Sequence, residues 1–134
     1  MGLMSREKGK RGEREVAALI SDLLGLTASR RVRQHEGDSD ILGVPGWCIE
    51  VKRCEKADPA DIRRWWEQAV AQALQDDARP LPALFYRPSR RDWRVVWPLS
   101  AAITVPFGVL WPAHEYAVES TPQAWASVVR EVAR

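Results

Sequence analysis

The segment Trp47–Arg53, with the sequence WCIEVKR, constrains the fold more than any other part of the chain. Its odd-numbered positions are apolar until the last, and its even-numbered positions include Glu50 and Lys52. Because side chains alternate between the two faces of a strand, one face would be apolar while the other carries a carboxylate and an ammonium group. The segment therefore predicts a strand with one face in the core and one face equipped for chemistry.

A turn-forming tetrapeptide, Gly43-Val44-Pro45-Gly46, separates this strand from the run Ser39–Leu42, and the pattern predicts a β-hairpin. Asp40 would then arrive beside the Glu50–Lys52 face. Carboxylate oxygens suit a hard divalent cation, and an ammonium group next to them can meet a phosphate. Asp38 is a second acid nearby, but it lies among turn residues, so the sequence favours Asp40.

An E-x-K triplet has little meaning alone, because it occurs by chance in roughly one chain in two of this size. The alternative interpretation is an ion pair facing solvent on an ordinary hairpin. The surroundings favour a functional interpretation: an alternating apolar strand, an aspartate before a tight turn, a helix with a glutamate beside its buried stripe, and a basic surface.

The chain has 134 residues, 28% of them charged and 46% hydrophobic, which predicts one folded domain. We expect a loose basic lead over residues 1–12, a core over residues 8–98 and a C-terminal extension with a helix over residues 99–134. Cys48 and Cys54 lie too far apart along one strand for a disulfide. The sequence shows no long apolar run and no secretory signal, which predicts a cytoplasmic protein without membrane contact.

The formal net charge is only +2, but the basic residues are clustered. Arginine dominates these clusters, and its guanidinium group can contact two phosphate oxygens at once. We expect a nucleic-acid-binding surface near the carboxylates, although a solvated basic face is the alternative for any single cluster. The candidate residues are Lys8, Lys10, Arg11, Arg30, Arg31, Arg33 and Arg53. A further cluster contains Arg87, Arg90, Arg91 and Arg94.

The first predicted helix has apolar residues at helical spacing from Val16 to Leu24 and ends at Gly25. Glu13 lies one turn before Val16, so it can reach inward from this helix, whereas Glu15 projects further from the buried stripe. A partner of the helix dipole in the first turn is the alternative role for Glu13.

The remaining elements follow from caps and periodicity. Asp58-Pro59 opens a helix that reaches to about Asp77, and Thr121-Pro122 caps a last helix. A polar stripe on the first of these two helices could line a DNA groove or face solvent; its members are Arg64, Gln68, Gln72 and Gln75. Strands are expected at residues 28–34, 81–86 and 93–98. The predicted order is α-β-β-β-α-β-β-α, an α/β fold with a small mixed sheet.

This order resembles the restriction-endonuclease-like PD-(D/E)xK nuclease superfamily, particularly the small Holliday junction resolvase-like nucleases of archaea and phages. The motifs that carry the resemblance are Gly9–Glu13, Asp40–Leu42 and Ile49–Arg53, within residues 8–98. Ser39 stands where the superfamily motif has proline. The resemblance implies a restriction endonuclease-like core with helices flanking the sheet.

The resemblance also implies roles for individual residues. Asp40 and Glu50 resemble the ligands of a Mg²⁺ or Mn²⁺ ion, with the Val51 carbonyl as a third oxygen. Glu13 resembles the first-helix glutamate that completes the metal site, through water or a second ion.

Two more residues are matched by the resemblance. Lys52 resembles the lysine that orients the attacking water and stabilises negative charge in the transition state. Gln68 resembles the downstream glutamine that orients groups around the site.

The implied function is a metal-dependent endodeoxyribonuclease that hydrolyses phosphodiester bonds in branched DNA, as a Holliday junction resolvase. The alternatives are a nuclease for a flap, an end or a specific duplex, and a non-catalytic DNA-binding protein on the same fold. A phage-encoded protein of this kind would act in the host cytoplasm.

A four-way junction has two symmetry-related strands to cut, which predicts a homodimer. Tryptophans outside the hairpin could supply the apolar interface, although filling the core is the alternative for each of them: Trp65, Trp66, Trp111 and Trp125.

Overall fold

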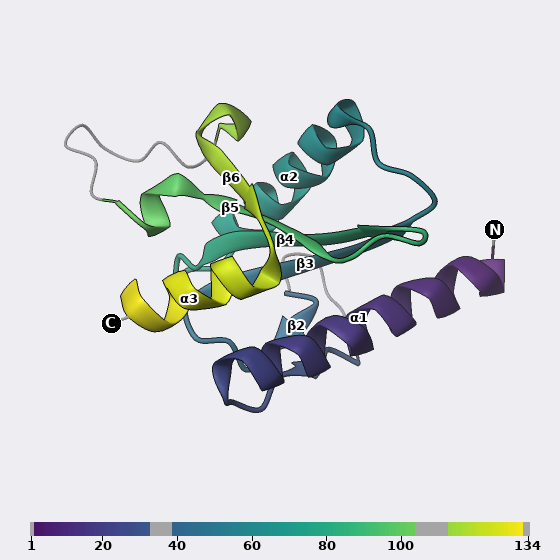
Figure 1. Cartoon of the computed structure of the whole chain (residues 1–134), viewed down its shortest axis with the longest axis horizontal. Helices are drawn as coiled ribbons and strands as arrows, with labels where there is room; N and C mark the ends of the chain where they lie inside the picture. The colour runs from purple at the N-terminus through teal and green to yellow at the C-terminus, as the bar shows by residue number, and fades with distance from the viewer. Residues whose placement is uncertain (1, 33–38, 104–112, 133–134) are drawn as a thin grey trace.

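The computed structural model describes residues 2–32, 39–103 and 113–132 (Figure 1). A four-stranded sheet has the order β3-β4-β5-β6. β3 (Trp47–Cys54) pairs parallel with β4 (Leu81–Pro88), and β4 pairs antiparallel with β5 (Arg94–Pro98). β5 in turn pairs antiparallel with β6 (Ala117–Ser120). The sheet is therefore small and mixed, as the sequence predicted, and β3 forms one of its edges.

Helices cover both faces of this sheet (Figure 1). α1 (Gly2–Leu24) and α3 (Pro122–Val132) lie on one face, and α2 (Pro59–Leu74) lies on the other. On the α1–α3 side the core contains residues such as Val16, Ile49, Phe85 and Trp125. On the α2 side it contains Trp66, Leu84, Tyr86 and Val96. The predicted α/β architecture with flanking helices is confirmed.

The alternation predicted for β3 is also confirmed, with one addition. Ile49 is fully buried towards α1, and Trp47 and Val51 pack against the same core. Cys48 and Glu50, on the opposite face, are buried as well. This second burial arises because α2 packs over that face, so the charged face of the strand does not point into open solvent.

Helix α1 begins at Gly2, whereas a loose basic lead was expected over residues 1–12. The sequence pattern missed these turns because the apolar stripe starts only at Val16. Contacts with the end of the sheet stabilise them instead. The backbone of Gly12 lies so close to Arg53 that an added Cβ would be 2.6 Å from its Cγ, and Lys8 forms an ion pair with Glu55 at 3.0 Å.

The expected hairpin of residues 39–53 is wrong in its pairing. β2 (Ile41–Leu42) pairs with β1 (Ser29–Arg30) in a separate two-stranded sheet. Gly43 explains the departure, because its positive φ of 92° and its close contact with the Thr27 carbonyl direct the chain beside β1. The strand expected at residues 28–34 is described only as β1, and residues 33–38, with Asp38, lie outside the described residues.

The C-terminal segment is part of the core and not an extension of it. β6 completes the sheet, and Trp125 of α3 is fully buried, with its ring edge-on to Phe85 at 5.1 Å between centroids. Trp66 is also fully buried, so neither of these tryptophans is free for a dimer interface. Trp65 packs against Tyr86, and Trp111 lies outside the described residues.

Both cysteines are free, as predicted. In the part of the chain that the structure describes, no helix is long and apolar enough to cross a membrane.

Candidate functional site

Asp40 lies against the outer edge of β3. Its backbone N–H donates to the Ile49 carbonyl at 2.8 Å, and its carboxylate Oδ2 accepts from the Val51 N–H at 2.8 Å. The residue is only 8% exposed. The edge of the strand therefore fixes both the backbone and the carboxylate of Asp40, and it does so without a regular hairpin.

Ser39 completes this attachment. Its hydroxyl accepts from the Ile49 N–H and donates to the Ile41 carbonyl, each at 2.8 Å. Because β2 pairs with β1, the edge N–H of Ile49 has no strand partner on that side, and the hydroxyl takes the place of one. Ser39 stands where the superfamily motif has proline, and a hydroxyl residue directly before the aspartate was the sequence signal for this role.

Glu50 lies at the middle of the same strand and is 9% exposed. The side-chain amide of Gln72 on α2 donates to both of its carboxylate oxygens, at 3.0 and 3.2 Å. Burial first, then the negative charge of Asp40 and a hydrogen bond between the two carboxyl groups, raise the pKa of Glu50 to about 8. The charge of Lys52 and the Gln72 bond oppose this rise.

Asp40 and Glu50 thus form a buried carboxylate pair. Two like charges in a low dielectric are unfavourable unless a proton or a cation lies between them. Because the N–H and C=O of a strand residue point to the same side, the Val51 carbonyl faces the same edge as the N–H that binds Asp40. Carboxylate and carbonyl oxygens are the donors that Mg²⁺ and Mn²⁺ prefer, so the residues present fit a divalent ion.

The structure places Glu13 against Arg30, with Oε1 accepting from Nε at 3.1 Å. Among the residues in the described ranges, no three His, Cys, Asp or Glu side chains gather into a group that could hold a metal ion. Glu13 is therefore not brought into a three-carboxylate cluster with Asp40 and Glu50.

The glutamine beside the carboxylates is Gln72, one helical turn beyond Gln68, which is exposed. Both belong to the polar stripe of α2, because residues four apart share a helix face. The stripe could be found from the sequence. The position of α2 over the sheet decides which turn of the helix covers Glu50, and a sequence pattern does not contain that position.

Several basic residues expected to bind DNA are engaged within the protein. Arg30 pairs with Glu13, the Arg31 guanidinium donates to the Ser39 carbonyl at 2.9 Å, and Lys8 pairs with Glu55. Arg11 is exposed, Lys10 is half-buried, and Arg33 lies outside the described residues.

Arg53 belongs to a second charged group, which we call the Glu15 cluster: Glu15, Arg53, Arg87 and Trp93. The Glu15 carboxylate accepts from all three partners, at 3.3, 2.8 and 3.0 Å respectively. The helical pattern predicted only that Glu15 projects further from the buried stripe. Its partners come from β3, β4 and the residue before β5, which a one-helix pattern cannot anticipate.

An aspartate at the edge of a strand, with a glutamate and a lysine two residues apart within that strand, is the arrangement that defines PD-(D/E)xK nucleases. The chain matches the family described as "Phage putative PDDEXK endonuclease" over residues 4–108, and it belongs to this family. It is therefore a nuclease of the PD-(D/E)xK type.

Individual proteins are similar to the chain as well. Protein D14 of Escherichia phage T5 is 27% identical to it, with 71% of each chain covered. The solved structure of Hjc, a Holliday junction resolvase from the archaeal hyperthermophile Archaeoglobus fulgidus, is 20% identical, with 90% of this chain and 86% of that chain covered and a TM-score of 0.48.

Proposed function

We propose that this protein is a metal-dependent endodeoxyribonuclease that hydrolyses phosphodiester bonds in branched DNA, with the four-way junction as its substrate. The observation that carries the proposal is the buried contact between the Asp40 and Glu50 carboxyl groups beside Lys52. The junction preference comes from the resemblance of the sequence motifs to small resolvase-like nucleases.

Asp40, Glu50 and the Val51 carbonyl would hold Mg²⁺ or Mn²⁺ at the edge of β3. A bound divalent ion would supply Lewis-acid stabilisation of the charge that develops on the phosphate. The Val51 N–H and the Gln72 amide keep the two carboxylates oriented towards this edge. Glu13, held by Arg30, is assigned the outer position on α1, where it would act through water.

Lys52 would orient the attacking water and stabilise negative charge on the phosphate in the transition state. Its charge already lowers the pKa of Glu50, so its ammonium group lies within electrostatic reach of the carboxylate pair. The orienting role expected of Gln68 passes to Gln72, because Gln72 holds both oxygens of Glu50.

The test is a panel of end-labelled DNAs (four-way junction, flap, duplex and single strand) incubated with Mg²⁺, Mn²⁺ or EDTA. We expect cuts in the junction that require a divalent ion. Metal-dependent cutting of flaps or ends in preference to junctions would replace the proposed substrate. Absence of cutting on every DNA with every metal would favour a non-catalytic DNA-binding role.

We also propose a homodimer, because two symmetry-related strands of a junction must be cut and one chain carries one carboxylate pair. A supercoiled cruciform plasmid should be converted directly to the linear form, and light scattering should give the mass of two chains. Nicked circles without paired cuts, or a monomer bound to a junction, would overturn this part of the proposal.

A further inference from the structure

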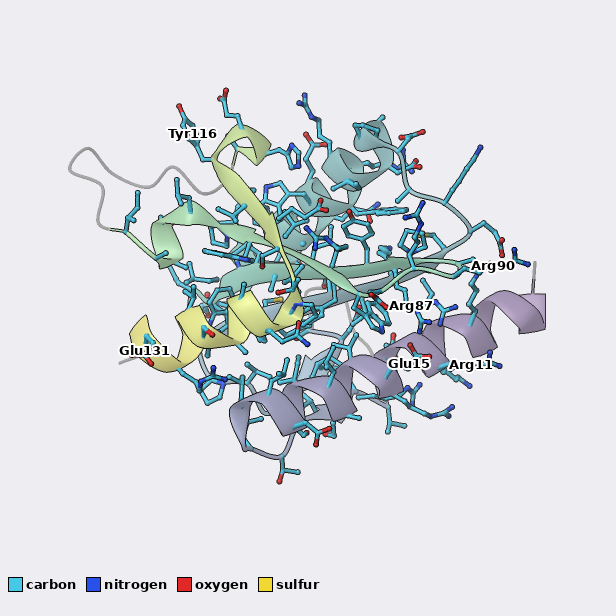
Figure 2. All side chains as sticks on the ribbon, viewed as in Figure 1. Arg11, Glu15, Arg87, Arg90, Tyr116 and Glu131 are labelled. Atoms are coloured by element: carbon cyan, nitrogen blue, oxygen red, sulfur yellow. The ribbon has the colours of Figure 1, made fainter. Side chains whose placement is uncertain are left out.

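Two basic segments that are far apart in the sequence meet beyond the end of β3. One is the first half of α1 and the other is the β4–β5 turn. Figure 2 shows Arg11, Glu15, Arg87 and Arg90 in the same part of the molecule, on the right of the view. Residues 87–94 contain four arginines and one aspartate, although the whole chain has a formal net charge of only +2. The basic charge is thus concentrated at this end.

The Glu15 cluster fixes the turn against α1. Oε1 of Glu15 accepts from Nη1 of Arg87 at 2.8 Å and from Nε1 of Trp93 at 3.0 Å, so the carboxylate contacts both ends of the turn. The Arg87 Nε donates to the Arg91 carbonyl at 2.6 Å, which holds the turn closed. The backbone of the turn is therefore oriented by the protein itself.

The cations at the tip of this arrangement point outward. Arg90 and Arg91 on the turn and Arg11 on α1 are all exposed. Arg53 and Arg87 lie behind them, with side chains that are 14% and 31% exposed. The inner arginines stabilise the surface, and the outer ones are available to an anionic partner.

Arg90 has a backbone φ of +65°, a conformation in which glycine would be less strained. An arginine with this backbone conformation is more strained than a glycine would be. Strained residues of this kind concentrate at functional sites. Arg79, at the other end of β4, shares this property with a φ of +54°. It provides an internal control, because it lies in the α2–β4 connection and not in the turn.

The surface is also next to the carboxylate site. Arg53 and Arg87, which lie behind the exposed arginines, pair in register, and Arg53 comes one residue after Lys52. Glu50 precedes Arg53 by three strand residues, which is about 10 Å. On a DNA strand this distance corresponds to about three nucleotides.

We propose that Arg11, Arg90 and Arg91 form one phosphate-binding surface, which contacts the backbone of a DNA duplex arm close to the cut without reading its bases. Glu15 is the positioning residue that joins its two halves. The inference rests on the proposed function, because it takes DNA as the substrate. Each phosphate contact displaces a condensed counterion, so the surface would make binding fall steeply with salt.

The experiment compares Arg90→Gly with Arg79→Gly in the chain of 134 residues. Both substitutions remove one exposed arginine from a left-handed position. Fluorescence anisotropy of a labelled duplex of arbitrary sequence, in EDTA at several salt concentrations, gives the affinity and its salt slope. Thermal unfolding should show both variants at least as stable as the wild type, because glycine relieves the positive φ.

We expect Arg90→Gly to weaken binding about 3–10-fold and to reduce the slope of log K against log salt by about one. Arg79→Gly should change the affinity less than about twofold and leave the slope unchanged. Arg11→Gln should reduce the slope like Arg90→Gly, and the double variant should lose about two units of slope. Equal binding by the two glycine variants would overturn the proposed phosphate-binding surface. An effect of Arg90→Gly without one of Arg11→Gln would show that α1 is not part of that surface.

A parallel cleavage assay separates this inference from the proposed function. Wild-type protein that binds duplex through Arg90 but cuts no DNA with any metal would remove the nuclease proposal and leave the surface standing. Wild-type protein that cuts DNA, while Arg90→Gly binds as tightly as Arg79→Gly, would remove the surface alone.

Discussion

Two glutamates on opposite sides of β3 have opposite electrostatic surroundings. Glu50 is buried beside Asp40, a second carboxylate, and its pKa is raised to about 8 by burial first and by the charge of Asp40 second. Glu15 lies beside the last residues of the same strand and accepts hydrogen bonds from Arg53, Arg87 and Trp93.

The difference separates a site of chemistry from a structural ion cluster. Charge that is buried without a counter-charge destabilises the fold until a cation or proton arrives, whereas a carboxylate surrounded by donors stabilises it. Removing the charge of each glutamate should therefore have opposite effects on stability, and only the carboxylate pair should control cleavage.

The largest expected effect is that of Asp40→Asn. It removes one half of the carboxylate pair, so we expect a loss of cleavage of about a thousandfold or more, with DNA affinity retained, because phosphate contacts lie elsewhere. Rates on a labelled junction with Mg²⁺ and anisotropy in EDTA measure the two quantities. Asp77→Asn, an exposed aspartate after α2, is the control. Normal cleavage by pure Asp40→Asn would remove the site assignment.

Lys52→Ala should reduce the cleavage rate about a hundredfold, because the ammonium group acts in the transition state, and should change binding far less. Rate and thermal unfolding need to be measured on one preparation. A variant that is less stable but keeps its rate per folded molecule would show that Lys52 only pairs with Glu50.

The pair Gln72→Ala and Gln68→Ala compares two turns of one helix. Gln72 orients Glu50 through two hydrogen bonds, so its loss should reduce metal affinity or activity about tenfold. Gln68 is exposed, and its substitution should be silent. A titration of the cleavage rate with Mg²⁺ measures both. The reverse result would restore the assignment that the sequence favoured.

The pKa of Glu50 predicts how the metal-free protein responds to pH. In the unfolded chain this carboxyl ionises near 4.5, whereas in the folded protein it keeps its proton to about pH 8. Between these values the folded state binds more protons, so the stability that the group contributes at low pH is lost as the pH rises through about 8. Glu50→Gln should therefore raise the free energy of unfolding near pH 8 by about 1–3 kcal/mol.

Urea unfolding in EDTA at pH 5 and pH 8 measures this effect. The gain of Glu50→Gln should be small at pH 5, and Mg²⁺ should stabilise the wild type more than the variant. A variant that is less stable than the wild type at pH 8 would show that the carboxylate pair is not strained.

Glu15→Gln should have the smallest effect and the opposite sign. An amide cannot satisfy two arginines, so the free energy of unfolding should fall by about 1 kcal/mol, a value that allows for the partial exposure of the group. Glu55→Gln, which alters an ion pair whose carboxylate is exposed, should leave the unfolding midpoint unchanged. A Glu15→Gln protein more stable than the wild type would show that the Glu15 charge, like that of Glu50, destabilises the fold.

Local signals were sufficient for much of the fold. The alternation of residues 47–53 identified β3 and the faces of its side chains. Asp58 caps α2 in a capping box with Asp61, and the Thr121 hydroxyl accepts from the Ala124 N–H at the start of α3. Each of these depends on residues within a few positions of one another, which is why a sequence pattern can report them.

Other features depend on partners that are distant in the sequence. β6 has four residues, too few to show a period, and it is a strand because β5 pairs with it. The first turns of α1 have no predicted stripe, and they are packed against Arg53 and Glu55 at the end of β3.

The sequence by itself determined the chemistry of this protein: a strand with a glutamate and a lysine on one face, an aspartate close before it, and an excess of arginine. The tertiary structure decided which groups meet. It placed Ser39 and Asp40 on the edge of β3 without a hairpin, brought Gln72 to Glu50, and gathered three donors around Glu15. The physical reason is that residue type and local spacing are properties of a segment, whereas hydrogen-bond partners and burial depend on how the segments pack.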